Sequence, residues 1–136
     1  MVASVRAIQD TNNGTGTAIT GTMPTVVDGD VVFAFVVHDA KAATVTADQG
    51  GWTEVVEPTP PEEDYSTYLY RRIASSEPAS YTWTLSASNG WRVIIVTVKD
   101  AHATTPINAE LRESSGTTTQ NTLAVGAITS DVDNCF

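Results

Sequence analysis

Two segments of this chain, residues 31–37 and 91–98, are apolar on both of their alternating faces. Successive side chains of a β-strand point to opposite sides of the sheet, so such a strand needs cover on both sides. Nowhere do apolar residues recur at the three- and four-residue spacing of a helix, so no helix is predicted to supply that cover. The two segments are therefore predicted to lie in the middle of a sheet whose outer surface is hidden by a loop or another subunit.

The other extended segments alternate apolar and polar residues with a period of two, which is typical of half-buried strands. They are residues 2–8, 17–22, 43–47, 52–56, 65–73, 81–85 and 118–129. Asn89-Gly90 is a turn signal that predicts a hairpin between residues 81–85 and 91–98. We therefore expect an all-β protein of about nine short strands: a single-domain antiparallel β-sandwich over residues 1–136, jelly-roll-like or, alternatively, wired like an immunoglobulin domain.

Charge and cysteine content exclude several functional classes. The formal net charge is -9 and the pI is about 4.3, whereas binding to nucleic acid or an anionic membrane needs a basic surface. The longest apolar run, residues 93–96, is too short to cross a bilayer. The single cysteine, Cys135, excludes an intrachain disulfide and a two-cysteine zinc site. No cofactor is predicted, and neither nucleic acid nor membrane is expected as a partner.

The sequence contains no motif of a reaction centre. His38 and His102 each lie close to an aspartate, but a G-x-S-x-G nucleophile elbow is missing. The carboxylates of residues 62–64 are adjacent in the sequence, whereas a glycosidase needs two carboxylates on opposite sides of a sugar. The protein is therefore predicted not to be an enzyme.

Four aspartates are weak candidates for a calcium site, because Ca²⁺ takes oxygen ligands from loops. They are Asp28, Asp30, Asp131 and Asp133. Aspartate also favours turns for its own backbone hydrogen bonding, and no glycine-punctuated calcium loop surrounds these residues. A structural role in turns is the favoured interpretation, so no metal is predicted.

Aromatic residues offer a second kind of candidate site. Tyr65 and Tyr68 follow the proline-rich loop of residues 57–64, and exposed tyrosine rings can stack on sugars. The tryptophans Trp52, Trp83 and Trp91 lie in or beside apolar-patterned strands, which favours a role in the core. A glycan site at Tyr65 and Tyr68 therefore stays open as an alternative.

Five short motifs occur in the same order as in a family of β-sandwich domains. They are GDVVFAF at 29–35, GWT at 51–53, YLYR at 68–71, SYTWT at 80–84 and TTPI at 104–107. In these motifs the chain resembles domains of tailed-phage virion proteins and of bacterial surface or extracellular proteins. The resemblance implies a structural or adhesive module, such as a capsid decoration, tail or fibre protein. The family pattern continues past the position of Asn134 with another apolar strand, so the domain is expected to be truncated there, or its last edge to be filled by another copy.

The expected function is assembly as repeated copies, in a virion formed in the host cytoplasm. The partners would be copies of this chain or a major capsid or tail protein. The interface would bury the outer apolar side chains of one central strand. The candidates are Val32, Ala34 and Val36, or Ile94, Val96 and Val98. The alternative is a carbohydrate-binding or adhesin module located at a cell surface or outside the cell.

Overall fold

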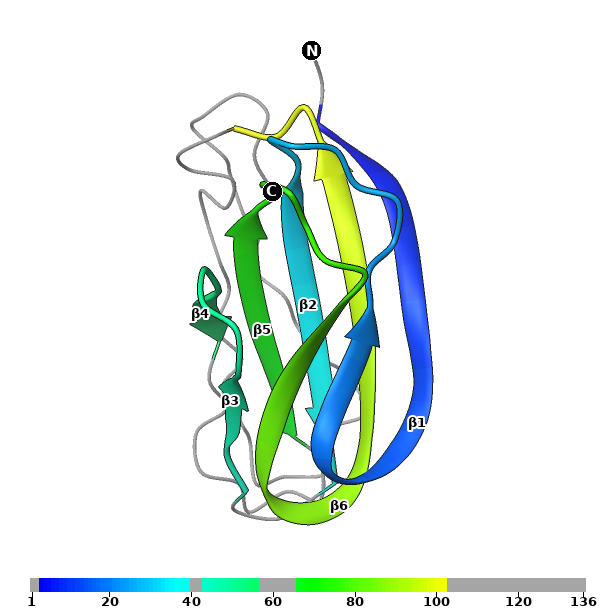
Figure 1. The fold of residues 1–136 in the computed structure, drawn as a ribbon, viewed down its shortest axis with the longest axis vertical. Coiled ribbons are helices and arrows are strands. Elements are labelled where there is room, and N and C mark those ends of the chain that lie inside the picture. Colours follow the sequence, from blue (N-terminus) through cyan, green and yellow to red (C-terminus); the bar gives the residue numbers. More distant parts are fainter. Residues whose placement is uncertain (1–2, 40–42, 57–65, 103–136) are drawn as a thin grey trace, which may run out of the picture.

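A computed structural model describes residues 3–39, 43–56 and 66–102 of the chain, and this part contains six β-strands and no helix. The strands are β1 (Ser4–Thr22), β2 (Val31–His38), β3 (Val45–Ala47), β4 (Thr53–Val56), β5 (Ser66–Ile73) and β6 (Ser80–Lys99). All pairs are antiparallel, in the order β1-β6-β2-β5-β4, and β3 also pairs with β6 (Figure 1). The predicted all-β, antiparallel fold is confirmed.

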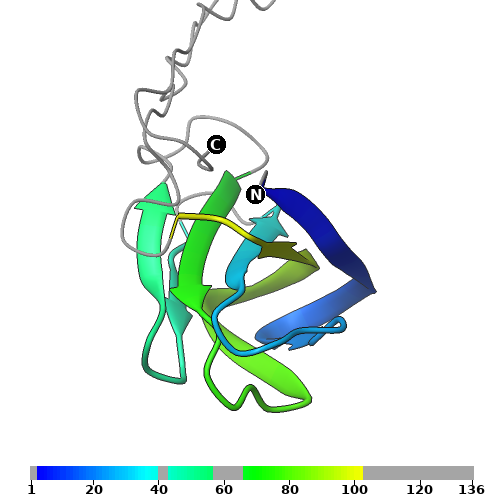
Figure 2. The same ribbon diagram turned by 90° about the horizontal axis from the view of Figure 1, so that it is seen from above.

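The two longest strands, β1 and β6, pair on both sides of a sharp bend and bend together (Figures 1 and 2). Gly14 and Gly16 of β1 lie opposite Trp91 and Asn89 of β6, and the register shifts on either side of this stretch. Glycine tolerates the unusual backbone of a sharp bend, and Gly16 has φ 132°. The predicted hairpin turn at Asn89-Gly90 is therefore wrong, because β6 runs through these two residues as one strand and pairs there with Gly16 and Thr15 of β1.

The bend brings the two halves of the sheet to opposite sides of one core. One half contains the β1–β6 pairing beyond the bend, where Ile19 lies opposite Trp83. These two residues share a buried cluster with Val32 of β2 and Ile95 of β6, which lie in the other half. The halves approach closely at Gly21, where a Cβ atom would lie 2.8 Å from Val93 Cγ1. Two facing halves around a common core are consistent with a β-sandwich, and the choice between jelly-roll and immunoglobulin-like wiring stays a prediction.

The predicted core positions of the tryptophans are confirmed. Trp83 is fully buried, and Trp52 and Trp91 are partly buried against the same cluster. The predicted strand at 118–129 and the chain end at 131–136 lie outside the described residues.

Candidate functional site

The surface of the sheet that faces away from the core cluster is the strongest candidate for a binding site, and we call it the outer face. Its residues alternate along each strand with those of the core, and the cross-strand register aligns them in rows such as Ile8, Val96 and Phe33. The outer face comprises Val5, Ile8 and Asp10 of β1, Arg92, Ile94, Val96 and Val98 of β6, Val31, Phe33, Phe35 and Val37 of β2, and Thr67, Leu69, Arg71 and Ile73 of β5.

Exposure on the outer face rises from its centre to its sides. Val31, Phe33 and Val98 of the inner strands β2 and β6 form a small buried cluster, with Phe35 and Leu69 among the half-buried residues around it. In the strands on either side, three apolar residues are exposed. They are Val5 at 52% and Ile8 at 61% in β1, and Ile73 at 39% in β5. Of the four large hydrophobic residues that are exposed in the described part of the chain, only Val27 lies off this face. Among the described residues, the exposed large hydrophobic side chains are therefore concentrated on the outer face.

The structure corrects half of the predicted interface. Val32, Ala34 and Val36 are completely buried in the main core by the chain itself, so they are not available to a partner. Ile94 and Val96 lie on the outer face and are half-buried, and Val98 lies there too but is buried in its central cluster. In an all-apolar strand a period of two does not reveal which set of residues faces the core.

Two charged side chains form an ion pair at one corner of the outer face. Arg92 of β6 donates hydrogen bonds to both carboxylate oxygens of Asp10 in β1, with its Nε 2.9 Å from Oδ1. This hydrogen bonding lowers the pKa of the Asp10 carboxyl from its ordinary value and raises the pKa of the Arg92 guanidinium. Both side chains are well exposed, so the pair contributes little to stability.

The β1 edge of the sheet is irregular. Its register against β6 shifts between Val5 and Ala7, between Thr11 and Gly14, and between Gly16 and Ala18. Bulges of this kind twist an edge strand and hinder pairing with a strand of another molecule. Association through the outer face is therefore favoured over strand pairing along β1.

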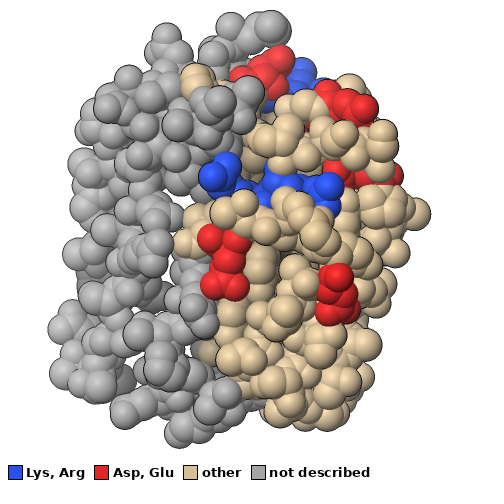
Figure 3. Space-filling view, turned by 60° about the vertical axis from the view of Figure 1, so that its left-hand side comes forward, with Lys and Arg blue, Asp and Glu red and all other residues tan. Residues whose placement is uncertain are grey.

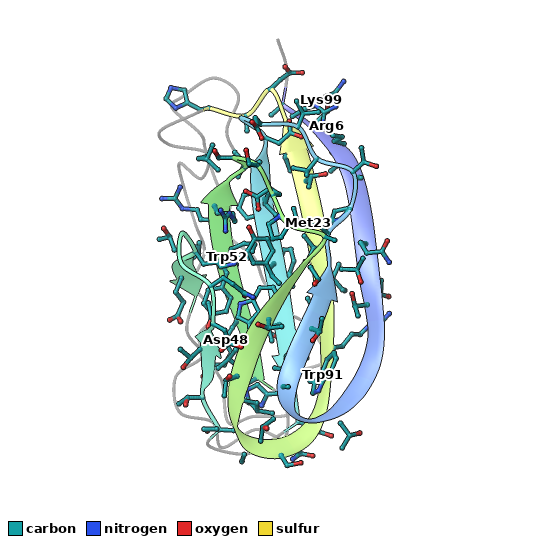
Figure 4. The ribbon with its side chains drawn as sticks, in the orientation of Figure 1. Arg6, Met23, Asp48, Trp52, Trp91 and Lys99 are labelled. Carbon is teal, nitrogen blue, oxygen red and sulfur yellow. The ribbon has the colours of Figure 1, made fainter. Side chains whose placement is uncertain are left out.

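The two described metal candidates, Asp28 and Asp30, serve the turn before β2. The Ser76 N–H donates to Asp28 Oδ1 at 2.7 Å, and the Val27 N–H donates to Asp30 Oδ2 at 2.9 Å. Asp30 also forms an ion pair with Arg6, which Figure 4 labels at the end of the sheet. Among the described residues no group of three or more potential metal ligands occurs, and Asp131 and Asp133 lie outside them.

The expected glycan residue Tyr68 lies in the core, which corrects the prediction that its ring is available to a sugar. Only 3% of Tyr68 is exposed, and its ring stacks with those of Tyr70 and His38 at centroid distances of 6.2 and 5.8 Å. Its hydroxyl donates to the Ala43 carbonyl at 3.4 Å. Tyr65 lies outside the described residues.

The structure does not bring the two histidines together. His38 ends β2 opposite Trp91, whereas His102 follows Lys99 at the opposite end of the sheet. A histidine-based reaction centre would need both residues, or one of them with a nucleophile, at one place.

A buried cluster that no sequence pattern predicted surrounds Arg72 of β5. The Arg72 guanidinium lies over the rings of Tyr81 and Trp52, 4.8 and 5.4 Å from their centroids, and Figure 4 labels Trp52 beside β5. It also forms an ion pair with Glu77 at 3.2 Å and donates to the Gly50 carbonyl at 3.2 Å. Such a cluster of charges beside aromatic rings is the kind of feature that often marks an active site.

The hydrogen bonds of Glu77 favour a structural role for this cluster. One carboxylate oxygen accepts from the Ser75 N–H at 2.8 Å and forms the ion pair with Arg72, and the other accepts from the Tyr81 hydroxyl. Both oxygens are thus engaged within the chain, and the Glu77 side chain is only 1% exposed. The cluster joins β5, the loop after it and the turn before β4.

The Tyr81 phenol should titrate only at strongly alkaline pH. Burial, followed by the hydrogen bond to Glu77, raises the pKa of Tyr81 well above its ordinary value of about 10. Because folding raises this pKa, Tyr81 contributes stability that is fully present below pH 10 and is lost as the pH rises beyond it. We expect the Tyr81 phenol of the folded protein to resist ionisation, measured by absorbance at 295 nm, until alkaline unfolding. Ionisation of Tyr81 near pH 10 in the folded protein would contradict this.

Charged groups are scattered over the described surface on the side of β3, β4 and β5 (Figure 3). The described part of the chain contains no helix suited to crossing a membrane. Comparison of the chain with protein-family models, with curated proteins and with solved structures found no match.

Proposed function

We propose that this protein is a non-enzymatic structural component that assembles as repeated copies through its outer face. The observation that carries the proposal is the concentration of exposed apolar side chains on that face, with Ile8 at 61% and Val5 at 52% exposed. Exposed apolar surface gathered on one side of a protein is typical of an interaction site.

Burial of these side chains would supply the driving force for association. Removing apolar surface from water contributes about 25 cal/mol per Å², or about 1.5–3 kcal/mol for a valine or isoleucine that becomes fully buried. Val5, Ile8 and Ile73 lie towards the sides of a face whose centre is already well packed. A partner that covers the sides would thus extend an existing apolar cluster.

The proposed setting is a virion of the tailed-phage type, as a capsid decoration, tail or fibre protein assembled in the host cytoplasm. The support for this setting is the resemblance of the motifs GDVVFAF, GWT, YLYR, SYTWT and TTPI to domains of such proteins. A major capsid or tail protein is then a second partner, beside further copies of this chain. The buried position of Tyr68 leaves the glycan alternative without support from the described residues.

Ile8→Lys should abolish self-association. A lysine at this exposed position of the outer face keeps the fold but places a charge where the next copy would pack. Sedimentation velocity over a rising concentration series should show assembly of the unaltered chain and single molecules of the variant. Thr20→Lys is the matched control, since Thr20 is exposed on the same strand beyond the bend. Single molecules of the unaltered chain at every concentration, or equal assembly of Ile8→Lys, would contradict the proposal.

A further inference from the structure

The bend of β6 contains an Asn-Gly dipeptide, Asn89-Gly90, that can modify itself chemically. Asparagine readily loses its side-chain amide group as ammonia when glycine follows, because glycine has no Cβ atom to shield the backbone nitrogen that attacks the side chain. An ordered strand usually prevents this reaction, since a neighbouring strand holds the hydrogen bond of that nitrogen. The local geometry at Asn89 therefore decides whether the folded chain can react.

The side chain of Asn89 takes the place of one hydrogen bond between β2 and β6. The pairing of His38 with Trp91 continues to Asp39 and Gly90, where the Asp39 N–H donates to the Gly90 carbonyl at 3.3 Å. A hydrogen-bonded antiparallel pair normally exchanges a second bond in the opposite direction. Here the Asn89 carboxamide stands in that position, with its Nδ2 donating to the Asp39 carbonyl at 3.2 Å.

This arrangement places the Gly90 nitrogen against the group that it would attack. The Gly90 N–H donates to Oδ1 of Asn89 at 2.9 Å, and the amide carbon Cγ is bonded to this oxygen. The hydrogen bond from Nδ2 to Asp39 fixes the carboxamide from its other end. Nucleophile and carbon are thus held side by side by the ordered chain, which favours an intramolecular reaction.

We propose that Asn89 is a site of spontaneous deamidation in the folded protein. A bond forms between the Gly90 nitrogen and Cγ of Asn89, while the bond between Cγ and Nδ2 breaks. The amide group leaves as ammonia, which carries away the proton of the Gly90 nitrogen. The product is a cyclic imide within β6. Water then opens one of its two bonds between carbonyl carbon and nitrogen, which leaves aspartate or isoaspartate at position 89.

Either product weakens the junction of β2 and β6. A carboxylate cannot donate, so the hydrogen bond to the Asp39 carbonyl is lost. The new charge also lies near the Asp39 carboxylate, whose Oδ2 is 3.0 Å from the position of a Cβ atom on Gly90. Isoaspartate adds a methylene group to the main chain of β6, which disturbs its pairing with Gly16. The modification therefore lowers stability, whether or not copies of the chain assemble.

Peptide mapping by mass spectrometry tests the proposal, because each deamidation adds about 1 Da. The full chain is incubated at mildly alkaline pH, once folded and once unfolded in guanidinium chloride. The unfolded sample gives the rate of an unrestrained Asn-Gly pair, for which Asn13-Gly14 is a second example in the same chain. Asn89 should deamidate at least as fast in the folded chain as in the unfolded chain. A slower reaction in the folded chain overturns the proposal, because the fold then protects Asn89 as an ordinary strand would.

Asn89→Gln is the matched variant, because it keeps the carboxamide. Its longer side chain must close a larger and less favourable ring, so position 89 of the folded variant should deamidate about tenfold more slowly than in the unaltered chain. Circular dichroism checks that the variant is folded. Equal rates at position 89 in the two folded chains would overturn the proposal, since attack by the Gly90 nitrogen would then not be the route.

Discussion

Trp83→Ala is expected to lower the free energy of unfolding by about 3–5 kcal/mol, the range for large-to-small changes of a buried aromatic residue. Trp83 is 0% exposed and lies in the second half of the sheet, where it packs against residues of the first. The centroid of its ring lies 5.5 Å from the ring centroid of Trp52 and 6.2 Å from that of Tyr70. Alanine would leave a cavity between the two halves that neighbouring rings fill only in part.

Urea denaturation followed by tryptophan fluorescence and by circular dichroism measures this change. Thr84→Ala is the matched control, because Thr84 is the next residue of β6 and is exposed. It should change the free energy of unfolding by far less than Trp83→Ala does. A loss below about 1 kcal/mol for Trp83→Ala, which is the scale of an ordinary surface change, would contradict the described core.

The strand positions could largely be predicted from the sequence because the signal is local. Alternation and turn residues predicted strands at 31–37 and 65–73, and the structure has β2 at Val31–His38 and β5 at Ser66–Ile73. The continuity of β1 and β6 could not be predicted in this way. Asn89-Gly90 is a turn signal by itself, and it becomes a bend within a strand only because Gly16 and Thr15 lie opposite and bend with it.

The alternation of residues did not predict which face of each central strand points to the core. Val32, Ala34 and Val36 are as apolar as Val31, Phe33 and Phe35, so their types do not distinguish core from outer face. The register with β5 makes the distinction, since Tyr70 lies opposite Ala34 and packs in the core. This register depends on contacts between residues that lie far apart in the sequence, so local alternation does not predict it.

The cluster around Arg72 had no sequence signal at all. Trp52, Arg72 and Glu77 come from three separate segments, and no motif spacing connects them. The fold alone brings these segments together. A sequence of this kind therefore predicts a strand that contains Arg72 but not the partners of its side chain.

Arg72→Ala is expected to lower the free energy of unfolding by about 3–5 kcal/mol, because it leaves the buried Glu77 carboxylate without its cation. The side chains of this pair are 14% and 1% exposed, whereas those of the second arginine–carboxylate pair, Arg92 and Asp10, are 49% and 38% exposed. Arg92→Ala is thus a matched control that should change stability little. Urea denaturation compares both variants with Arg72→Ala/Glu77→Gln, in which the uncompensated charge is gone and part of the loss should be recovered. Equal effects of Arg72→Ala and Arg92→Ala would contradict a buried ion pair, since burial is the difference between the two sites.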